Sequence, residues 1–163
     1  MKARARPATS ADVPLLVEMM TEFYAESGYP LDAARARTAF EQLLTDPRSG
    51  QVWLLLWDGQ PAGYVVMTLG YSMEYGGRDA FVDDLFVRPS CRGRGLGTLA
   101  LAELRTACHE LGVRALHLEV GYANDRAAAL YLKAGFVAHD RRLLTLPLAG
   151  PTQPEAGGGR GET

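Results

Sequence analysis

The most constraining feature of this chain is an apolar run that leads into a loop of alternating glycines and then into a helix. The run covers residues 82–87, and Gly93, Gly95 and Gly97 follow it beside two arginines. Glycines keep backbone N–H groups open to an anion at a helix entrance, and the helix dipole favours an anion there. The segment therefore predicts a site for the pyrophosphate of a nucleotide-bearing cofactor.

Length and charge narrow the class of protein. A chain of 163 residues suits one domain with its own core. A net charge of -2 and a pI near 5.9 argue against a nucleic-acid partner, which requires a basic surface. Two cysteines form neither a disulfide framework nor a metal cluster, so we expect no metal and a cytoplasmic location. No segment approaches the roughly 18 apolar residues of a membrane span, so no membrane partner is expected.

Apolar periodicity predicts a helical first third followed by strands. Helices are expected from residue 10 to Gly28 and over residues 32–45. Strands are expected over residues 51–57 and 61–71, joined by a hairpin turn at Asp58-Gly59, and a third strand over residues 80–87. These strands form an antiparallel meander.

The second half of the chain predicts a parallel crossover. The glycine loop opens a helix over residues 95–111, and residues 114–120 form the returning strand of a right-handed unit. A further helix is expected over residues 126–134, then a final pair of strands over residues 136–139 and 141–148. Residues 149–163 carry no large apolar side chain and are predicted to be disordered.

Two other nucleotide-binding loops fit less well. A phosphate loop of the Walker type needs a lysine after its glycines, and none is present. A dinucleotide fold gains support from Glu119, which lies 22 residues beyond Gly97, near the usual separation of the ribose-binding acid. However, five residues separate the strand from Gly93, and an antiparallel meander precedes the unit. Both features disfavour that fold.

Two blocks of sequence carry a family resemblance. Arg92, Gly95 and Gly97 fit the R/Q-x-x-G-x-G/A signature of the GCN5-related N-acetyltransferases (GNAT). Residues 124–136 fit the second block of that family, in which an Asn precedes Leu-Tyr and a closing Gly-Phe. The chain resembles the family over about residues 4–148. This resemblance implies a single α/β domain over residues 1–148, with a mixed, twisted sheet of about six to seven strands and flanking helices.

The resemblance also implies a reaction, in which a primary amine attacks the thioester of acetyl-CoA directly. The backbone N–H of Val87 would polarise the carbonyl, and Tyr131 would act as general acid. Tyr131 could instead simply pack in the core, and Asn124 could simply cap a helix. The residues implied to bind the cofactor are Leu85, Phe86, Val87, Arg92, Gly93, Arg94, Gly95, Leu96, Gly97, Thr98, Asn124, Ala127 and Tyr131.

The base and the acceptor stay open. Residues 82–87 resemble, more loosely, the spermidine/spermine (diamine) acetyltransferase branch, which tends to carry Glu-Asp where this chain has Asp83-Asp84. Successive strand residues face opposite sides, so only one of these two is expected in the cleft. Asp83 or Glu119 could act on the amine, directly or through water. Acidic and aromatic loop residues are expected to line the acceptor cleft and favour a cationic amine, namely Tyr24, Glu26, Tyr29 and Glu74.

The favoured function is acetyl-CoA-dependent acetylation of a small-molecule amine such as a polyamine or an amino acid-like compound. A protein amino terminus or lysine is the alternative acceptor. A CoA-binding regulatory module without catalysis is the alternative from another class. The family resemblance also implies a homodimer.

Overall fold

Residues 2–149 are described by the computed structural model, so the tail predicted to be disordered lies almost wholly outside the described residues. Five strands form one sheet in the order β1-β2-β3-β4-β5. The strands are β1 (Ala3–Pro7), β2 (Gly50–Trp57), β3 (Gln60–Ser72), β4 (Gly77–Val87) and β5 (Ala115–His117). The helices are α1 (Val13–Glu26), α2 (Ala33–Thr45), α3 (Leu96–Glu110) and α4 (Asp125–Lys133), with 3-10 turns at Ser10–Asp12 and Pro89–Cys91.

The hairpin between β2 and β3 confirms the prediction for its turn. Trp57 pairs with Gln60, so the loop has two residues. Asp58 and Gly59 both have positive φ angles, of 48° and 78°. This is the backbone that a tight hairpin with right-handed strand twist requires, and Asp-Gly is among the dipeptides that adopt it most readily.

The predicted crossover is also confirmed. β4 and β5 are parallel and are connected through α3. Their ladder is short, because it joins only Asp79, Ala80 and Phe81 to residues 115–117. Beyond Phe81, β4 therefore continues toward the glycine loop without a described strand on that side.

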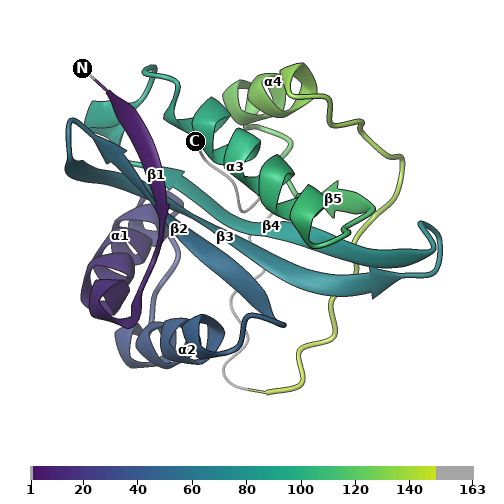
Figure 1. The fold of residues 1–163 in the computed structure, drawn as a ribbon, viewed down its shortest axis with the longest axis horizontal. Coiled ribbons are helices and arrows are strands. Elements are labelled where there is room, and N and C mark those ends of the chain that lie inside the picture. The colour runs from purple at the N-terminus through teal and green to yellow at the C-terminus, as the bar shows by residue number, and fades with distance from the viewer. Residues whose placement is uncertain (1, 150–163) are drawn as a thin grey trace.

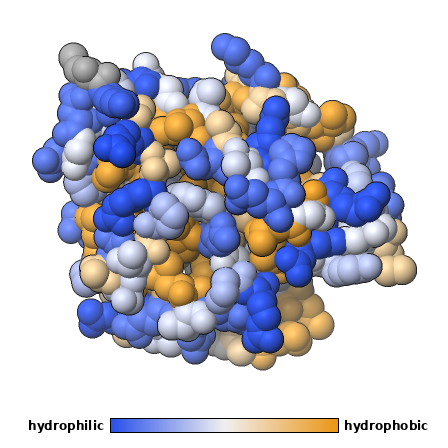
Figure 2. Space-filling model, viewed as in Figure 1, coloured by the Kyte–Doolittle hydropathy of each residue, from blue (hydrophilic) through white to orange (hydrophobic). Residues whose placement is uncertain are grey.

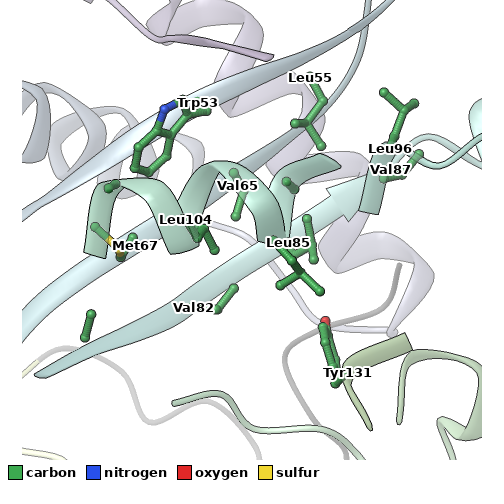
Figure 3. Packing of buried hydrophobic residues seen from close by; sticks show 14 of the residues in the cluster. Trp53, Leu55, Val65, Met67, Val82, Leu85, Val87, Leu96, Leu104 and Tyr131 are labelled. Atoms are coloured by element: carbon green, nitrogen blue, oxygen red, sulfur yellow. The ribbon is translucent and has the colours of Figure 1, made fainter. Parts of the chain in front are cut away.

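Two apolar cores cover the two faces of the sheet, and Figure 1 shows α1 and α2 on one face with α3 on the other. The α3 side contains Leu85 and Val87 of β4, Leu104 of α3 and Tyr131 of α4, as Figure 3 shows. The α1 side contains Tyr64, Phe86 and Phe23. Val87, Phe86 and Leu85 are at most 2% exposed, so β4 is buried on both faces where it approaches the loop.

The sheet differs from the prediction in three ways. Residues 3–7 form an edge strand that the sequence did not predict, because its alternating arginines and alanines lack the β-branched and aromatic residues typical of strands. The strand expected over residues 114–120 is confined to Ala115–His117. The final pair expected over residues 136–139 and 141–148 is absent, so the described sheet has five strands instead of six to seven. None of the described helices is long and apolar enough to span a membrane.

Candidate functional site

The glycine loop forms a pocket at the entrance of α3. Gly93 and Gly95 adopt φ angles of 73° and 80°, a left-handed conformation that favours glycine, and Gly95 caps α3. A Cβ built on Gly95 would meet nothing within 4 Å, so the space in front of it is open. The pocket has a volume of about 330 Å³ and is lined by Val87, Cys91, Arg92, Gly93, Gly95, Leu96, Gly97, Thr98, Arg126 and Leu130.

Both loop arginines bind other parts of the protein. Arg92 donates from Nε to the carbonyl oxygen of Val87 at 2.8 Å and from its terminal nitrogen to Glu26 at 2.7 Å. The guanidinium of Arg94 lies over the ring of Trp57, 5.0 Å from its centroid. The loop therefore offers an anion its backbone N–H groups, while its arginines hold the loop in shape.

Arg126 is a pocket residue that the sequence reasoning missed. It lies in the first turn of α4, two positions after the cap Asn124, and lines the glycine pocket. Its terminal nitrogen lies 3.9 Å from the position of a Cβ built on Gly93. A guanidinium there suits a phosphate, because Arg can bind two of its oxygens. The signal available in the sequence was its place beside Asn124 in the second block.

The backbone of Val87 faces the open side of β4. Arg88 N–H donates to the carbonyl of Ala62 at 2.8 Å, and Gly63 pairs with Val87. Hydrogen-bonding direction alternates along an antiparallel ladder, so the N–H and C=O of Val87 point away from β3. The bond from Arg92 to that carbonyl agrees with this direction. The N–H is thus directed to the side of β4 where the ladder with β5 has ended.

Tyr131 lies in the α3-side core near this edge. Its ring is 2% exposed and packs against Phe136 at a centroid distance of 5.9 Å. Figure 3 shows its hydroxyl directed toward the Leu85 end of β4. Burial raises the pKa of Tyr131 well above its usual range, so the phenol stays protonated at neutral pH. Asn124 caps α4, because its Oδ1 accepts the N–H of the fully buried Ala127 at 3.1 Å.

A β-bulge corrects the expected orientation of the paired carboxylates. Val66 pairs with Asp84 while Met67 pairs with Val82, so Asp83 is an extra residue in β4. The bulge resets the alternation of side chains along the strand, and both carboxylates lie on the α1 side of the sheet. The expectation that they face opposite sides was therefore wrong. Asp83 is exposed, whereas Asp84 is 3% exposed and accepts a hydrogen bond from the hydroxyl of Tyr64 at 3.0 Å.

The α1 side also gathers part of the predicted acceptor lining. Tyr64 and Tyr24 both belong to the α1-side core, and burial, followed by the charge of Asp84, raises the pKa of Tyr64. The ring of Tyr29 lies 6.4 Å from that of Tyr24. This face therefore combines carboxylates with aromatic rings, a combination that favours a cation.

Other predicted residues lie elsewhere. Glu26 is occupied by its ion pair with Arg92. Glu74 accepts two hydrogen bonds from Arg141, at 2.8 and 3.0 Å, and these bonds lower the pKa of its carboxyl. Glu119 lines a groove on the α3 side that also contains Tyr131. The structure thus separates the two candidate bases, with Asp83 on the α1 face and Glu119 in the groove that Tyr131 also lines. Among residues 2–149, no group of His, Cys, Asp or Glu is arranged to hold a metal.

A second residue that the sequence reasoning missed is Arg88, which connects the loop to α1. Its guanidinium donates to Glu22 at 2.7 Å and to Glu18 at 2.6 Å, and also to the carbonyl of Pro61. The hydrogen bonds to Glu22 raise the pKa of Arg88 above its usual value. The spacing of glutamates at residues 18, 22 and 26 on one helix face was the available signal.

The sheet that opens beyond Phe81, the glycine loop and the buried tyrosine define an α/β acyltransferase domain. Within that class, the chain belongs to the acetyltransferase (GNAT) family, because the family model matches residues 16–136. The predicted family resemblance is confirmed.

Comparisons with individual proteins agree with the family. The chain is 32% identical over 81 residues to the thialysine N-epsilon-acetyltransferase of Bos taurus, which spans 47% of this chain and 48% of that protein. It is 31% identical over 80 residues to an N-acetyltransferase of Methanocaldococcus jannaschii, spanning 48% of this chain and 35% of that protein. The matches thus span half or less of these curated relatives. The first supports, loosely, the diamine acetyltransferase branch.

Solved structures share the fold over nearly the whole chain. An integron cassette protein, HFX_CASS3, from the mobile metagenome of Cole Harbour Salt Marsh is 46% identical, with a TM-score of 0.82 over 90% of this chain and 91% of that one. A predicted acetyltransferase with acetyl-CoA from Clostridium acetobutylicum is 18% identical, with a TM-score of 0.76 over 89% of this chain and 96% of that one. The latter shows likeness of fold alone.

Proposed function

We propose that this domain transfers acetyl from acetyl-CoA to the primary amine of a small molecule. The observation that carries this proposal is the arrangement at the end of β4. There, the N–H of Val87 points to the open edge, the glycine pocket begins, and the buried Tyr131 lies on the same side. The likeness to a thialysine N-epsilon-acetyltransferase supports a small amine as acceptor.

The residues present fit the cofactor. A pyrophosphate suits the pocket because Gly93 and Gly95, whose positive φ angles favour glycine, leave its floor without side chains. Arg126 would bind a phosphate from the rim, and the edge of β4 at residues 85–87 would bind the pantetheine arm as a neighbouring strand does. When bound, acetyl-CoA supplies an acetyl group already activated as a thioester.

The chain's own groups then have distinct tasks. The N–H of Val87 donates to the carbonyl oxygen on which charge develops. Tyr131 keeps its proton at neutral pH and donates it to the departing sulfur. The amine approaches from the α1 face, where Asp83 takes up its proton directly or through water. Tyr24 lies on the same face, against the α1-side core, and its ring would favour a cationic acceptor.

Tyr131→Phe tests this assignment, because it removes the proton donor and retains the ring. We expect kcat, measured as free thiol released from acetyl-CoA, to fall by about 10²-fold or more, with CoA affinity by calorimetry unchanged within about twofold. The control is Tyr122→Phe, which alters a fully exposed tyrosine and should leave both quantities unchanged. Equal losses of turnover and affinity would exclude the acid role.

The amine panel separates the alternative functions. It should contain diamines, thialysine, amino acids and peptides with a free amino terminus or lysine. Turnover of small amines alone supports the proposal, whereas turnover of peptides alone would assign a protein acceptor. Binding of CoA without thiol release from any amine would indicate a regulatory module instead.

A further inference from the structure

A histidine and an aspartate face each other where β4 and β5 pair. Nε2 of His117 on β5 lies 3.3 Å from Oδ2 of Asp79 on β4. Both side chains are partly buried, with 25% and 13% of their surfaces exposed. The proposed reaction gives neither residue a task, although a histidine oriented by a carboxylate is a common proton acceptor in enzymes.

The pair lies on the α1 side of the sheet. Ala80 and Val82 of β4 belong to the α3-side core. Side chains alternate along a strand, so those of Asp79 and Phe81 point to the other face. The imidazole of His117 packs against the ring of Phe81, which places it on that face as well. The α1 side is the face from which the amine is proposed to approach.

Neighbouring residues hold the pair in one arrangement. The rings of Phe81 and Tyr75 lie 5.1 and 5.5 Å from the imidazole of His117. Gly70 lies opposite Asp79 in β3, and a Cβ built on Gly70 would come within 2.8 Å of Oδ1 of Asp79. The glycine therefore leaves room for the carboxylate. Because Nε2 faces this carboxylate, Nε2 carries the proton and Nδ1 of the neutral ring can accept one.

His117 lies close to the proposed path of the amine. It pairs with Phe81, and Asp83 follows two residues later in β4 on the same face. With a rise of about 3.3 Å per residue and a strand spacing of about 4.8 Å, the Cα atoms of His117 and Asp83 are about 8 Å apart. Both side chains can therefore contact the same small group, either the amine or a water molecule beside it.

His117 also has a route for releasing a proton. Within the described residues β5 pairs on one edge only, and the groove that Tyr131 lines, with a volume of about 1070 Å³, reaches around its other edge to His117. Figure 2 shows mainly hydrophilic surface over the right-hand end of the molecule, where Figure 1 places the turn between β3 and β4. A proton on the imidazole can thus pass to water. Besides Asp79 and Asp83, the titratable and charged groups around His117 in this groove are Tyr75, His109, Glu119, His139, Arg141 and Arg142.

We infer that His117, oriented by Asp79, is the proton acceptor that converts the ammonium form of the amine into the neutral nucleophile. This role rests on the proposed function. The ammonium gives one proton to Nδ1 of His117, directly or through water. The nitrogen lone pair then forms the C–N bond as the C–S bond breaks, and the sulfur takes the proton of Tyr131. The nitrogen loses its second proton to Asp83. His117 and Asp83 release their protons to water, and Tyr131 regains one from water.

His117→Gln tests this role, because it removes the proton acceptor and keeps a polar side chain of similar size. At pH 7 we expect kcat/KM for the amine, measured as free thiol released, to fall by about 10²-fold. At about pH 9.5 much more of the amine is already neutral, so the loss should shrink by at least about tenfold. A purely structural role would give the same loss at both pH values. The control is His109→Gln, at an exposed histidine in the last turn of α3, which should match the wild type at both.

Variants of Asp79, a positioning residue, give a second test. Asp79→Asn should lower kcat/KM by about tenfold at pH 7, and Asp79→Glu should recover most of that loss. Nitrogen-15 NMR of the full chain without CoA should show the Nε2–H form of the His117 ring, and both neutral forms in Asp79→Asn. The NMR measurement requires neither acetyl-CoA nor a folded His117→Gln variant.

The outcomes separate this role from the proposed function. A wild-type chain that releases no thiol with any amine would overturn the proposed function and the role of His117 with it. With an active wild type, three results would overturn the role of His117 alone. These are a His117→Gln variant as active as the wild type, an equal loss at both pH values, and a His117 ring form that Asp79→Asn leaves unchanged.

Discussion

Tyr64→Phe removes a single hydroxyl from the centre of the α1-side core. That hydroxyl donates to Asp84 at 3.0 Å, and the two residues are 0% and 3% exposed. The ring lies 6.0 Å from that of Phe40 and 6.1 Å from that of Phe86, and phenylalanine preserves these contacts. The variant therefore isolates one hydrogen bond to a buried carboxyl group.

The expected cost follows from the class of bond. A hydrogen bond to a charged group contributes about 1.5–3 kcal/mol, and a buried acceptor that loses its donor also keeps its desolvation penalty. We expect Tyr64→Phe to lower the free energy of unfolding by about 2–3 kcal/mol, out of a typical total of about 5–15 kcal/mol. Tyr64→Phe combined with Asp84→Asn should cost less than the sum of the single variants, because both remove the same bond.

Urea unfolding followed by circular dichroism measures these differences, first at pH 7 and then in alkaline buffer. Burial, followed by the charge of Asp84, raises the pKa of Tyr64 in the folded chain. Above about pH 10 the unfolded chain loses the Tyr64 proton while the folded chain keeps it, so stability falls as pH rises. Tyr64→Phe should remove that part of the alkaline loss. A variant within about 0.5 kcal/mol of wild type, with additive double-variant energies, would refute this reasoning.

Two other predictions concern charge. Arg126→Gln should weaken CoA affinity by about tenfold, and by more at low salt, because it removes a phosphate contact. Calorimetry at two salt concentrations measures the difference, with Lys133→Gln, at an exposed lysine, as the control. Hydrogen bonds from Arg6 lower the pKa of Asp12 to about 2, so its stabilisation is present above about pH 4 and is lost as pH falls toward 2. Asp12→Asn should cost about 1 kcal/mol at pH 7, because Arg6 is partly exposed and screened, and almost nothing at pH 2; urea unfolding at both pH values checks this.

Local chemistry made much of the fold predictable. The Asp58-Gly59 turn, the glycine loop and the helical periodicity of α1 to α4 each depend on near neighbours, and each was predicted within a few residues. The final strands failed for a different reason. Alternating leucines over residues 143–148 specify a strand-like face, but they do not specify which sheet accepts it.

The candidate site was harder to predict because its contacts join distant parts of the chain. Arg92 was predicted from its motif, but its ion pair with Glu26 joins residues 66 positions apart in the sequence, and no local pattern indicates that contact. The orientation of Asp84 depends on a bulge of one residue, which no alternation of polar and apolar residues reveals. By contrast, motif spacing was enough to locate Tyr131 and the glycines, because each motif lies within one short segment of the chain.

The glutamates on one face of α1 hold the segment that follows β4 in place against this helix. Glu18, Glu22 and Glu26 recur every fourth residue, as do their partners Arg88 and Arg92 on the loop side. Glu18 and Glu22 are 62% and 38% exposed, so the ion pairs of Arg88 contribute at most about 1 kcal/mol each. Their main effect is therefore to fix the position of Arg88 relative to α1. Arg92 also donates a hydrogen bond to the carbonyl of Val87. Because Arg92 binds Glu26 of α1 as well, it holds Val87, whose N–H is proposed to polarise the thioester, in place relative to the helix that borders the proposed amine path.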